Sequence, residues 1–245
     1  MSHLKKVWPK LILIGSSSTQ YSFSADGCWG SLLANFLQRK CDVINRGFSG
    51  YNTRWCNKMI PSILSEFDAK NISMVTVFLG ANDSNLPTNK QQHVPLEEFK
   101  QNLLEIVEKI QSHGVPREKV VIIGPPASNI SAWEKDCQIN GRVCTKSNTE
   151  TAKYAKACVE AARESGCSSV DMYTEMVKEK DWENMLNDGL HLSSRGCEYL
   201  FDLLKPVVTK VTAELPMLYP DWKQMEVLLL YCCFVSFVYW SIAAP

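Results

Sequence analysis

The stretch KLILIGSSSTQ, residues 10–20, decides the fold of this chain. Four consecutive aliphatic residues, 11–14, run directly into Gly15 and three serines, which predicts a fully buried strand that ends in a small polar turn. A strand buried on both faces is typical of a parallel sheet, and in open α/β sheets ligands bind beyond the carboxyl ends of the strands. The three serines therefore lie where chemistry is expected, although the same residues could simply cap the following helix.

Further apolar runs alternate with helical patterns along the chain. We predict five strands, at residues 11–14, 42–45, 73–79, 119–123 and 169–172. We predict helices at residues 29–39, 53–67, 99–114, 148–165 and 195–215. Short strands separated by helices imply parallel βαβ units whose crossovers cover both faces of a sheet. The sequence therefore predicts an α/β fold, a three-layer α/β/α sandwich with a five-stranded parallel sheet.

One segment does not follow this alternation. Residues 127–147 show no clear period, and they include Trp133 and two cysteines. The segment is long for a connection between two elements of a small domain. We expect it to form part of a pocket wall.

Composition restricts the class of protein. A chain of 245 residues, 45% of them hydrophobic, suits a single well-buried domain. The 26 basic and 26 acidic residues are interspersed, so the basic surface of a nucleic-acid binder is absent. The ten cysteines are scattered without a CxxC pair, which indicates reduced thiols of a cytoplasmic protein. The N-terminus contains no apolar run long enough for a secretory signal, and we predict neither a metal site nor a cofactor.

Histidine is scarce in this sequence, and a general base near pH 7 is most often a histidine. His3 lies in the terminal arm, and His113 precedes a glycine at a helix end, where a structural role is favoured. His93 lies in a long polar loop. His191 follows Asp188 by three residues, and a carboxylate at that spacing can hold the Nδ1 proton and leave Nε2 to deprotonate a nucleophile. The same spacing is also common in solvated helix caps, so it does not decide the matter alone.

The motifs become specific in combination. Gly15-Ser16-Ser17, the NRGFSG segment, GAND at 80–83 and DGLH at 188–191 occur in the order and spacing of the SGNH (GDSL-type) hydrolases. The segments RGFSGYNTRW, FLGANDS, HVPLEE, NDGLHLS and LPMLYPDW resemble the isoamyl acetate-hydrolysing esterase group of that family, over about residues 11–222. The resemblance implies a flavodoxin-like sandwich with strand order 2-1-3-4-5 and a central nucleophile strand. It also implies a serine esterase that hydrolyses small carboxylic esters, such as acetyl or short-chain acyl esters.

The resemblance also implies roles for single positions. Ser17 matches the nucleophile, His191 the general base and Asp188 the acid that orients it. The backbone N–H groups of Ser17 and Gly50 and the side-chain amide of Asn82 match the donors of the oxyanion hole. These residue types suit the task, because glycine lets the backbone approach a carbonyl closely and an amide donates without losing a proton. The expected partner is a small-molecule ester, not a nucleic acid, and the oligomeric state is left open.

The nucleophile turn departs from the family pattern. Ser16 stands where the family has aspartate, and Ser18 stands where an aliphatic residue is usual. A serine makes fewer and weaker hydrogen bonds than a carboxylate, so the turn that carries Ser17 is expected to be less firmly held. Two hypotheses therefore remain, a working ester hydrolase and a catalytically impaired relative that binds a ligand or a partner.

The C-terminus carries a second unusual feature. Residues 227–244, VLLLYCCFVSFVYWSIAA, contain no charge and as a helix would span about 27 Å, just short of a bilayer core. The segment is equally consistent with a membrane anchor, with docking on the domain and with an atypical terminus. We divide the chain into a hydrolase domain, residues 1–222, and a hydrophobic tail, residues 223–245. The expected location is the cytoplasm, with membrane association through the tail as the open alternative.

Overall fold

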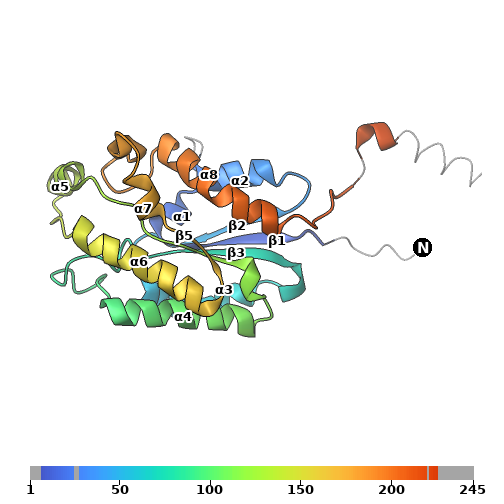
Figure 1. The fold of residues 1–245 in the computed structure, drawn as a ribbon, viewed down its shortest axis with the longest axis horizontal. Helices are drawn as coiled ribbons and strands as arrows, with labels where there is room; N and C mark the ends of the chain where they lie inside the picture. The colour runs from blue at the N-terminus through green and yellow to red at the C-terminus, as the bar shows by residue number, and fades with distance from the viewer. Residues whose placement is uncertain (1–6, 25–27, 220, 226–245) are drawn as a thin grey trace, which may run out of the picture.

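The computed structural model describes residues 7–24, 28–219 and 221–225 (Figure 1). Its sheet contains five parallel strands in the order β2-β1-β3-β4-β5. The strands are β1 (Lys10–Gly15), β2 (Asp42–Gly47), β3 (Ile72–Phe78), β4 (Val120–Ile123) and β5 (Ser168–Val170). The predicted parallel sheet and its strand order are confirmed. β1 is an inner strand bonded on both edges, while the middle position of the sheet belongs to β3.

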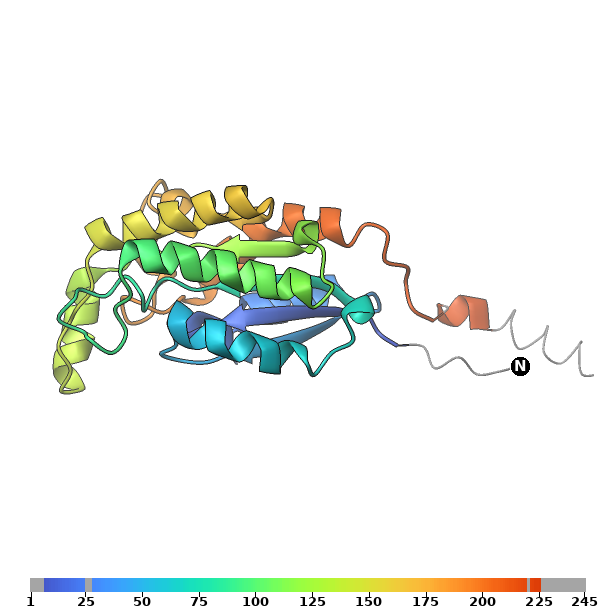
Figure 2. The same cartoon turned by 90° about the horizontal axis from the view of Figure 1, so that it is seen from below.

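Helices connect the strands and cover both faces of the sheet. The α-helices are α1 (Ser17–Gln20), α2 (Trp29–Phe36), α3 (Thr53–Leu64), α4 (Leu96–Ser112), α5 (Ile130–Ile139), α6 (Asn148–Ser165), α7 (Met172–Met176) and α8 (Ser194–Val211). Short 3₁₀ helices span Ala69–Asn71, Arg117–Lys119 and Trp182–Met185. Figure 1 shows α2 and α8 on one face of the sheet and α3 and α4 on the other, and Figure 2 shows α4 beside α6. This arrangement is the three-layer sandwich that the sequence predicts.

Alternate residues of β1 supply the two halves of the core. Ile12 and Ile14 pack into the apolar cluster beneath α3, α4 and α6. Leu11 and Leu13 pack into the cluster beneath α2, α7 and α8. Because successive strand residues point to opposite faces, an uninterrupted aliphatic run is what a strand between two helix layers requires. The same run brings Gly15 to the end of the strand, where it is in register with the last residues of β2 and β3.

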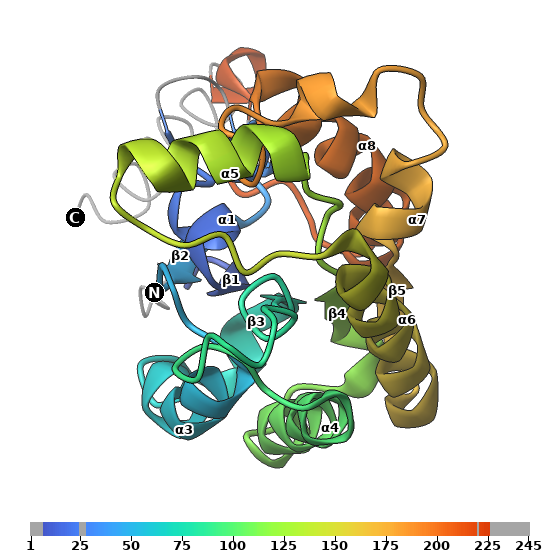
Figure 3. The ribbon, with the colours of Figure 1, turned by 90° about the vertical axis from the view of Figure 1, so that its left-hand side faces the viewer.

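The carboxyl ends of the strands face one end of the molecule, and Figure 3 looks onto that end. α1 lies there directly after β1, and α5 crosses in front of it. The segment that follows α5 passes over the ends of the strands on its way to α6. A layer of connections at this end of the sheet is where ligand sites of open α/β folds are found.

The structure corrects two details of the sequence prediction. The segment 127–147 contains helix α5, which no periodic pattern indicates, because only Trp133 and Cys137 are buried in it and its other residues are partly or fully exposed. The last strand ends at Val170, two residues earlier than predicted. The Asp171 side chain then accepts a hydrogen bond from the Thr174 N–H and caps α7.

Most of the described cysteines are buried. The eight cysteines within the described part of the chain form no disulfide. Cys56 and Cys158 are fully buried, and burial raises the pKa of the Cys56 thiol to about 12 and that of the Cys158 thiol well above its usual value. Such thiols stay protonated and unreactive.

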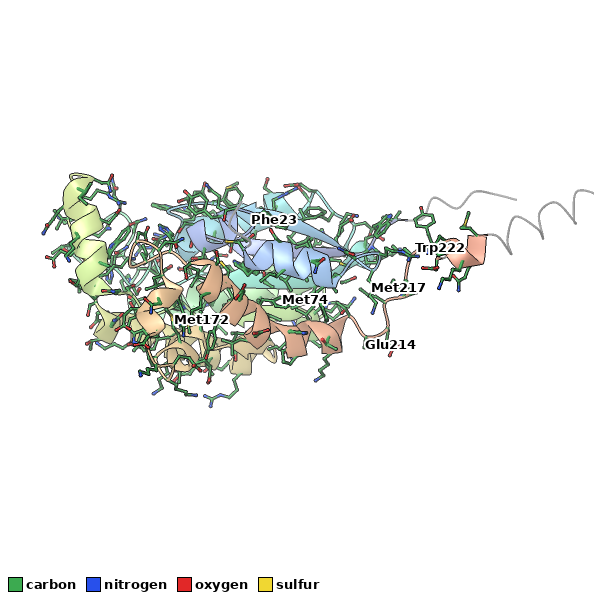
Figure 4. The ribbon with its side chains drawn as sticks, turned by 90° about the horizontal axis from the view of Figure 1, so that it is seen from above. Phe23, Met74, Met172, Glu214, Met217 and Trp222 are labelled. Carbon is green, nitrogen blue, oxygen red and sulfur yellow. The ribbon has the colours of Figure 1, made fainter. Side chains whose placement is uncertain are left out.

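The end of the described chain leaves the sandwich. Met217 and Trp222 lie on an extension after α8, at the end of the molecule opposite α5 (Figure 4). The extension contacts the body where the Leu218 N–H donates to the Arg39 carbonyl oxygen at 2.6 Å, whereas Trp222 is 70% exposed. None of the helices in the described ranges is long and apolar enough to span a membrane. The apolar run 227–244 lies outside these ranges, so the boundary after residue 222 stays a prediction.

Candidate active site

Ser17 lies where β1 meets the short helix α1. Gly15 ends the strand, Ser16 is the N-cap of α1 and Ser17 is its first residue. A Cβ atom at Gly15 would lie 2.2 Å from Thr19 Oγ1 and 2.5 Å from the Phe78 carbonyl oxygen, so no larger residue fits there. As the first residue of a helix, Ser17 has a backbone N–H with no acceptor inside that helix. The sequence thus places both a hydroxyl and an unused N–H at the end of the sheet.

The loop before α8 presents His191 to this turn. The Asn187 N–H donates to the His191 carbonyl oxygen at 2.8 Å and closes the loop on itself. Gly189 has φ +92°, and a Cβ atom there would lie 2.5 Å from the backbone nitrogen of Trp133 on α5. Glycine is therefore required both for the bend and for the close approach of α5.

Ser17, His191 and Asp188 form one hydrogen-bonded line. The Ser17 Oγ and His191 Nε2 atoms are 3.1 Å apart, and the His191 Nδ1 and Asp188 Oδ2 atoms are 2.6 Å apart. The second carboxylate oxygen, Oδ1, accepts the backbone N–H groups of Leu190 and His191, each at 2.8 Å. With a carboxylate at Nδ1, that nitrogen carries the proton and Nε2 is left to accept the serine proton. Ser17 and His191, which are 174 positions apart in the sequence, are thus in contact.

The carboxylate of Asp188 remains charged over the whole neutral range. Burial alone would raise its pKa, but the hydrogen bonds from the His191 ring and from the His191 and Leu190 N–H groups outweigh that effect. Together they lower the pKa of Asp188 to about 2. An ionised carboxylate beside the imidazole stabilises the imidazolium that forms when His191 accepts a proton.

Two aromatic rings flank the imidazole. Tyr21 and Trp133 meet the His191 ring edge to face, with ring centroids 5.9 and 6.0 Å away. Edge-to-face contacts with two rings favour one orientation of the imidazole, the one in which Nε2 meets Ser17 Oγ. The sequence placed Trp133 only within an expected pocket wall, and it did not point to Tyr21, which belongs to no motif.

The predicted oxyanion donors lie around the same space. Ser17, Gly50, Asn82 and His191 all line one cavity of about 390 Å³. Gly50 has φ +84°, a conformation that favours glycine. The Asn82 side-chain amide donates one hydrogen bond to the Tyr51 carbonyl oxygen at 2.9 Å. An amide has two N–H donors, so the second remains available to a ligand.

The remaining walls of the cavity come from two segments. The loop between β3 and α4 supplies Asn85, Asn89 and Gln92, and the segment 127–147 supplies Trp133, Cys137, Arg142, Val143, Thr145 and Lys146. The expectation that the segment 127–147 forms a pocket wall is confirmed. Sequence reasoning did not single out the three amide residues, although they lie in a polar loop directly after Asn82. Within the described ranges, no three histidine, cysteine or acidic side chains are placed to hold a metal ion.

Two buried charges hold the loop that carries Asn82. Asp83 Oδ1 accepts hydrogen bonds from the Thr53 N–H at 2.8 Å and from the Thr53 hydroxyl at 2.5 Å, and so ties the loop to α3. The Lys146 ammonium donates to the Ala81 carbonyl oxygen on the other side of Asn82. Burial raises the pKa of Asp83 to about 6 and lowers that of Lys146 to about 8. The loop is therefore fixed on both sides of the candidate donor.

Ser16 occupies the N-cap of α1 without capping it. Its side chain is 3% exposed and makes no hydrogen bond to the first turn. The far end of α1 is well held, because the Trp29 indole N–H donates to the Ser18 carbonyl oxygen at 2.8 Å and the Asn45 amide donates to that of Thr19 at 2.8 Å. At the beginning of the turn, next to Ser17, the Ser16 carbonyl oxygen accepts from the Thr19 and Gln20 N–H groups, and the Ser16 side chain adds no further support.

Comparison with known proteins agrees with this geometry. The chain matches the profile of the GDSL-like Lipase/Acylhydrolase family over residues 13–199, a span that contains all five predicted site residues. It is similar to the isoamyl acetate-hydrolyzing esterase 1 homolog of Rattus norvegicus, with 46% identity over 223 residues that cover 90% of this chain and 89% of the relative. The Homo sapiens homolog is 42% identical over 221 residues, which cover 89% of each chain.

A solved structure shows the same fold. The lipase/acylhydrolase from Enterococcus faecalis superposes with a TM-score of 0.66 at 22% identity, and the match covers 86% of this chain and 100% of that one. At this identity the likeness concerns the fold alone. The family profile and the relatives above 40% identity carry the assignment. The chain belongs to the GDSL-like lipase/acylhydrolase (SGNH) family and is a carboxylic ester hydrolase of that family.

Proposed function

We propose that this protein is a serine esterase that hydrolyses small carboxylic esters with Ser17 as nucleophile, His191 as general base and Asp188 as the acid that orients it. The observation that carries the proposal is the line of contacts from Ser17 Oγ to His191 Nε2, 3.1 Å, and from His191 Nδ1 to Asp188 Oδ2, 2.6 Å. A nucleophile in contact with a base that is itself oriented by a third group is the arrangement that acyl transfer requires.

In the first half of the reaction, Ser17 Oγ attacks the ester carbonyl carbon while its proton passes to His191 Nε2. The carbonyl oxygen becomes an oxyanion, and the N–H groups of Ser17, Gly50 and Asn82 stabilise it. The tetrahedral intermediate then collapses, and the imidazolium gives its proton to the departing alkoxide. The alcohol leaves, and the acyl group stays on Ser17.

In the second half, water takes the place of the alcohol. His191 Nε2 removes a proton from a water molecule, and the resulting hydroxide attacks the acyl carbon. The same three donors stabilise the second oxyanion. Collapse returns the proton to Ser17 Oγ and releases the carboxylic acid, so the net change is one ester bond and one water converted to an acid and an alcohol.

The cavity supports small substrates. Its volume of about 390 Å³ lies near the lower end of the range for small-molecule sites, about 300–1,000 Å³. Acetyl and other short acyl esters fit such a space. A series of p-nitrophenyl esters from acetate to decanoate measures the limit, and we expect kcat/KM to fall as the acyl chain lengthens.

The choice of nucleophile among three adjacent serines can be tested directly. A fluorophosphonate reacts with a serine only where a base activates the hydroxyl and the oxyanion is stabilised. We expect labelling at Ser17 alone, identified by peptide mass spectrometry. An adduct on Ser16 or Ser18 would contradict the assignment, and an unlabelled protein would favour the alternative of a ligand-binding relative without catalysis.

The departure at Ser16 has a measurable consequence. Ser16→Asp supplies a carboxylate at an N-cap that now makes no capping bond, and charge-assisted hydrogen bonds to the first turn of α1 contribute about 1.5–3 kcal/mol, partly offset by burial of the charge. A firmer turn improves the position of Ser17, so we expect kcat to rise about tenfold with a smaller change in KM.

Ser16→Asn provides the matched control, because it can cap the helix without adding a charge and should recover part of the gain. A kcat for Ser16→Asp at or below that of the parent protein would show that the contacts from Trp29 and Asn45 already compensate for the missing aspartate. The combined change Ser16→Asp and Ser17→Ala should be inactive in either case.

A further inference from the structure

The side chain of Gln92 bridges the two loops that carry the candidate oxyanion donors. Its Nε2 donates to the Gly50 carbonyl oxygen at 3.0 Å. Its Oε1 accepts from the side-chain amides of Asn85 at 3.2 Å and Asn89 at 3.1 Å. Both polar atoms of this amide therefore take part in hydrogen bonds, and none of their partners is Ser17, His191 or Asp188.

The orientation of the Gln92 amide follows from its partners. The Gly50 carbonyl oxygen can only accept, so the nitrogen of Gln92 must face it. The opposite orientation would place two oxygens together at Gly50 and would place the Gln92 NH₂ against the amide donors of Asn85 and Asn89. The hydrogen bonds leave one arrangement.

These contacts close into a ring. The Asn85 amide that donates to Gln92 also donates to the Asn82 carbonyl oxygen at 2.8 Å. The Asn82 side chain donates to the carbonyl oxygen of Tyr51, which follows Gly50 in the chain. The ring thus runs from Gly50 through Gln92, Asn85 and Asn82 and returns through Tyr51.

A second contact fixes the backbone of the same loop. Asn52 is the N-cap of α3, where its oxygen accepts the Trp55 N–H, and its amide nitrogen donates to the Gln92 carbonyl oxygen at 3.0 Å. The loop of residues 50–52 therefore holds the Gln92 backbone, while the Gln92 side chain holds the Gly50 carbonyl oxygen of that loop. Cross-connected hydrogen bonds of this kind limit the motion of both loops more than isolated ones do.

We propose that Gln92 is a positioning residue that holds the Gly50 N–H and the Asn82 amide at the separation that an oxyanion requires. The proposal rests on the oxyanion hole of the proposed function. Gln92 Nε2 fixes the plane of the Gly50–Tyr51 peptide, and at φ +84° that plane determines where the preceding peptide with the Gly50 N–H points. Gln92 Oε1, through Asn85, fixes the backbone of Asn82.

Such a role affects the chemical step more than binding. Oxyanion donors act on charge that develops only in the transition state, so a displaced donor raises the barrier without weakening ground-state binding. Gln92→Met keeps the length of the side chain and removes both its donor and its acceptor. We expect kcat on p-nitrophenyl acetate to fall about tenfold, with KM within about twofold of the parent value.

Gln92→Glu gives a signature that a purely structural role would not produce. At pH 8 the carboxylate cannot donate to the Gly50 carbonyl oxygen, so kcat should fall at least as far as in Gln92→Met. Protonation at lower pH restores an O–H donor, so the ratio of variant to parent kcat should rise as the pH falls from 8 to about 4, the ordinary range of a glutamic acid. For Gln92→Met the same ratio should stay constant.

Gln91→Glu is the matched control, because it adds the same charge one residue away on an exposed side chain. Its ratio to the parent protein should stay near one at every pH. A Gln92→Met protein with parental kcat, or a Gln92→Glu ratio that does not change with pH, would overturn the positioning role.

Asn82→Ala separates the positioning role of Gln92 from the proposed oxyanion hole itself. If it lowers kcat about a hundredfold or more while the Gln92 variants do not, only the inference on Gln92 fails, and if it has no effect, the proposed oxyanion hole fails.

Discussion

Replacing Ser17 by alanine should lower kcat by about 10⁴-fold or more on p-nitrophenyl acetate. In the proposed reaction the Ser17 hydroxyl is the attacking group, and it lies 3.1 Å from the base, His191 Nε2. A neighbouring hydroxyl would have to move to this position to take its place. The activity that remains should reflect the oxyanion donors and substrate binding alone. Steady-state kinetics, with a mutant purified free of parent enzyme, measures the loss.

Ser18→Ala is the control for this loss. The Ser18 side chain is partly exposed. The hydrogen bond from the Trp29 indole on α2 goes to the Ser18 backbone carbonyl oxygen and does not use the hydroxyl. Its kcat should stay within about threefold of the parent value, since neither the proposed triad nor the proposed oxyanion hole uses the Ser18 hydroxyl. A Ser17→Ala protein with a tenth of the parent kcat would show that another group is the nucleophile.

The double change Ser17→Ala with His191→Ala should cost no more than Ser17→Ala alone. Each proton that His191 moves in the proposed reaction belongs either to attack by Ser17 or to hydrolysis of the acyl group on Ser17, so without the hydroxyl the imidazole has no step to assist. Additive losses would mean that His191 contributes separately from Ser17.

The fold could be predicted from the sequence because its inner strands β1, β3 and β4 are buried on both faces. Residues 11–14 form a continuous apolar run, and residues 73–79 are apolar apart from Ser73 and Thr76, as a strand between two helix layers requires. Helix α5 could not be predicted in this way, since it buries little more than Trp133 and Cys137 and therefore carries no apolar stripe. Its one local signal is Asn129, whose side chain caps the helix by accepting the Ala132 N–H.

The candidate site was predicted as far as motifs reach. Ser17 lies just after β1, His191 lies just before α8, and both belong to recognisable motifs. The topology therefore brings them to the same end of the sheet. Tyr21 and Gln92 could not be found, because their roles depend on contacts across the fold with His191 and Gly50. No sequence period encodes such contacts, and only the folded chain shows which side chains meet.

Replacing Asp188 by asparagine should lower kcat by about 10⁴-fold at neutral pH. Asp188 Oδ1 accepts two backbone N–H groups, those of Leu190 and His191, so the asparagine oxygen must remain at that position. The asparagine NH₂ group then faces His191 Nδ1 and forces that nitrogen to accept. The imidazole proton moves to Nε2, which faces Ser17 and can no longer take its proton.

Asp188→Ala separates this tautomer effect from a loss of charge. With a pKa of about 2, Asp188 is ionised throughout the neutral range, so both variants remove one negative charge beside His191. Only Asp188→Asn also imposes the wrong tautomer, so the kcat of Asp188→Ala should lie at or above that of Asp188→Asn. An Asp188→Asn protein with parental kcat would show that the 2.6 Å contact with His191 has no part in the reaction.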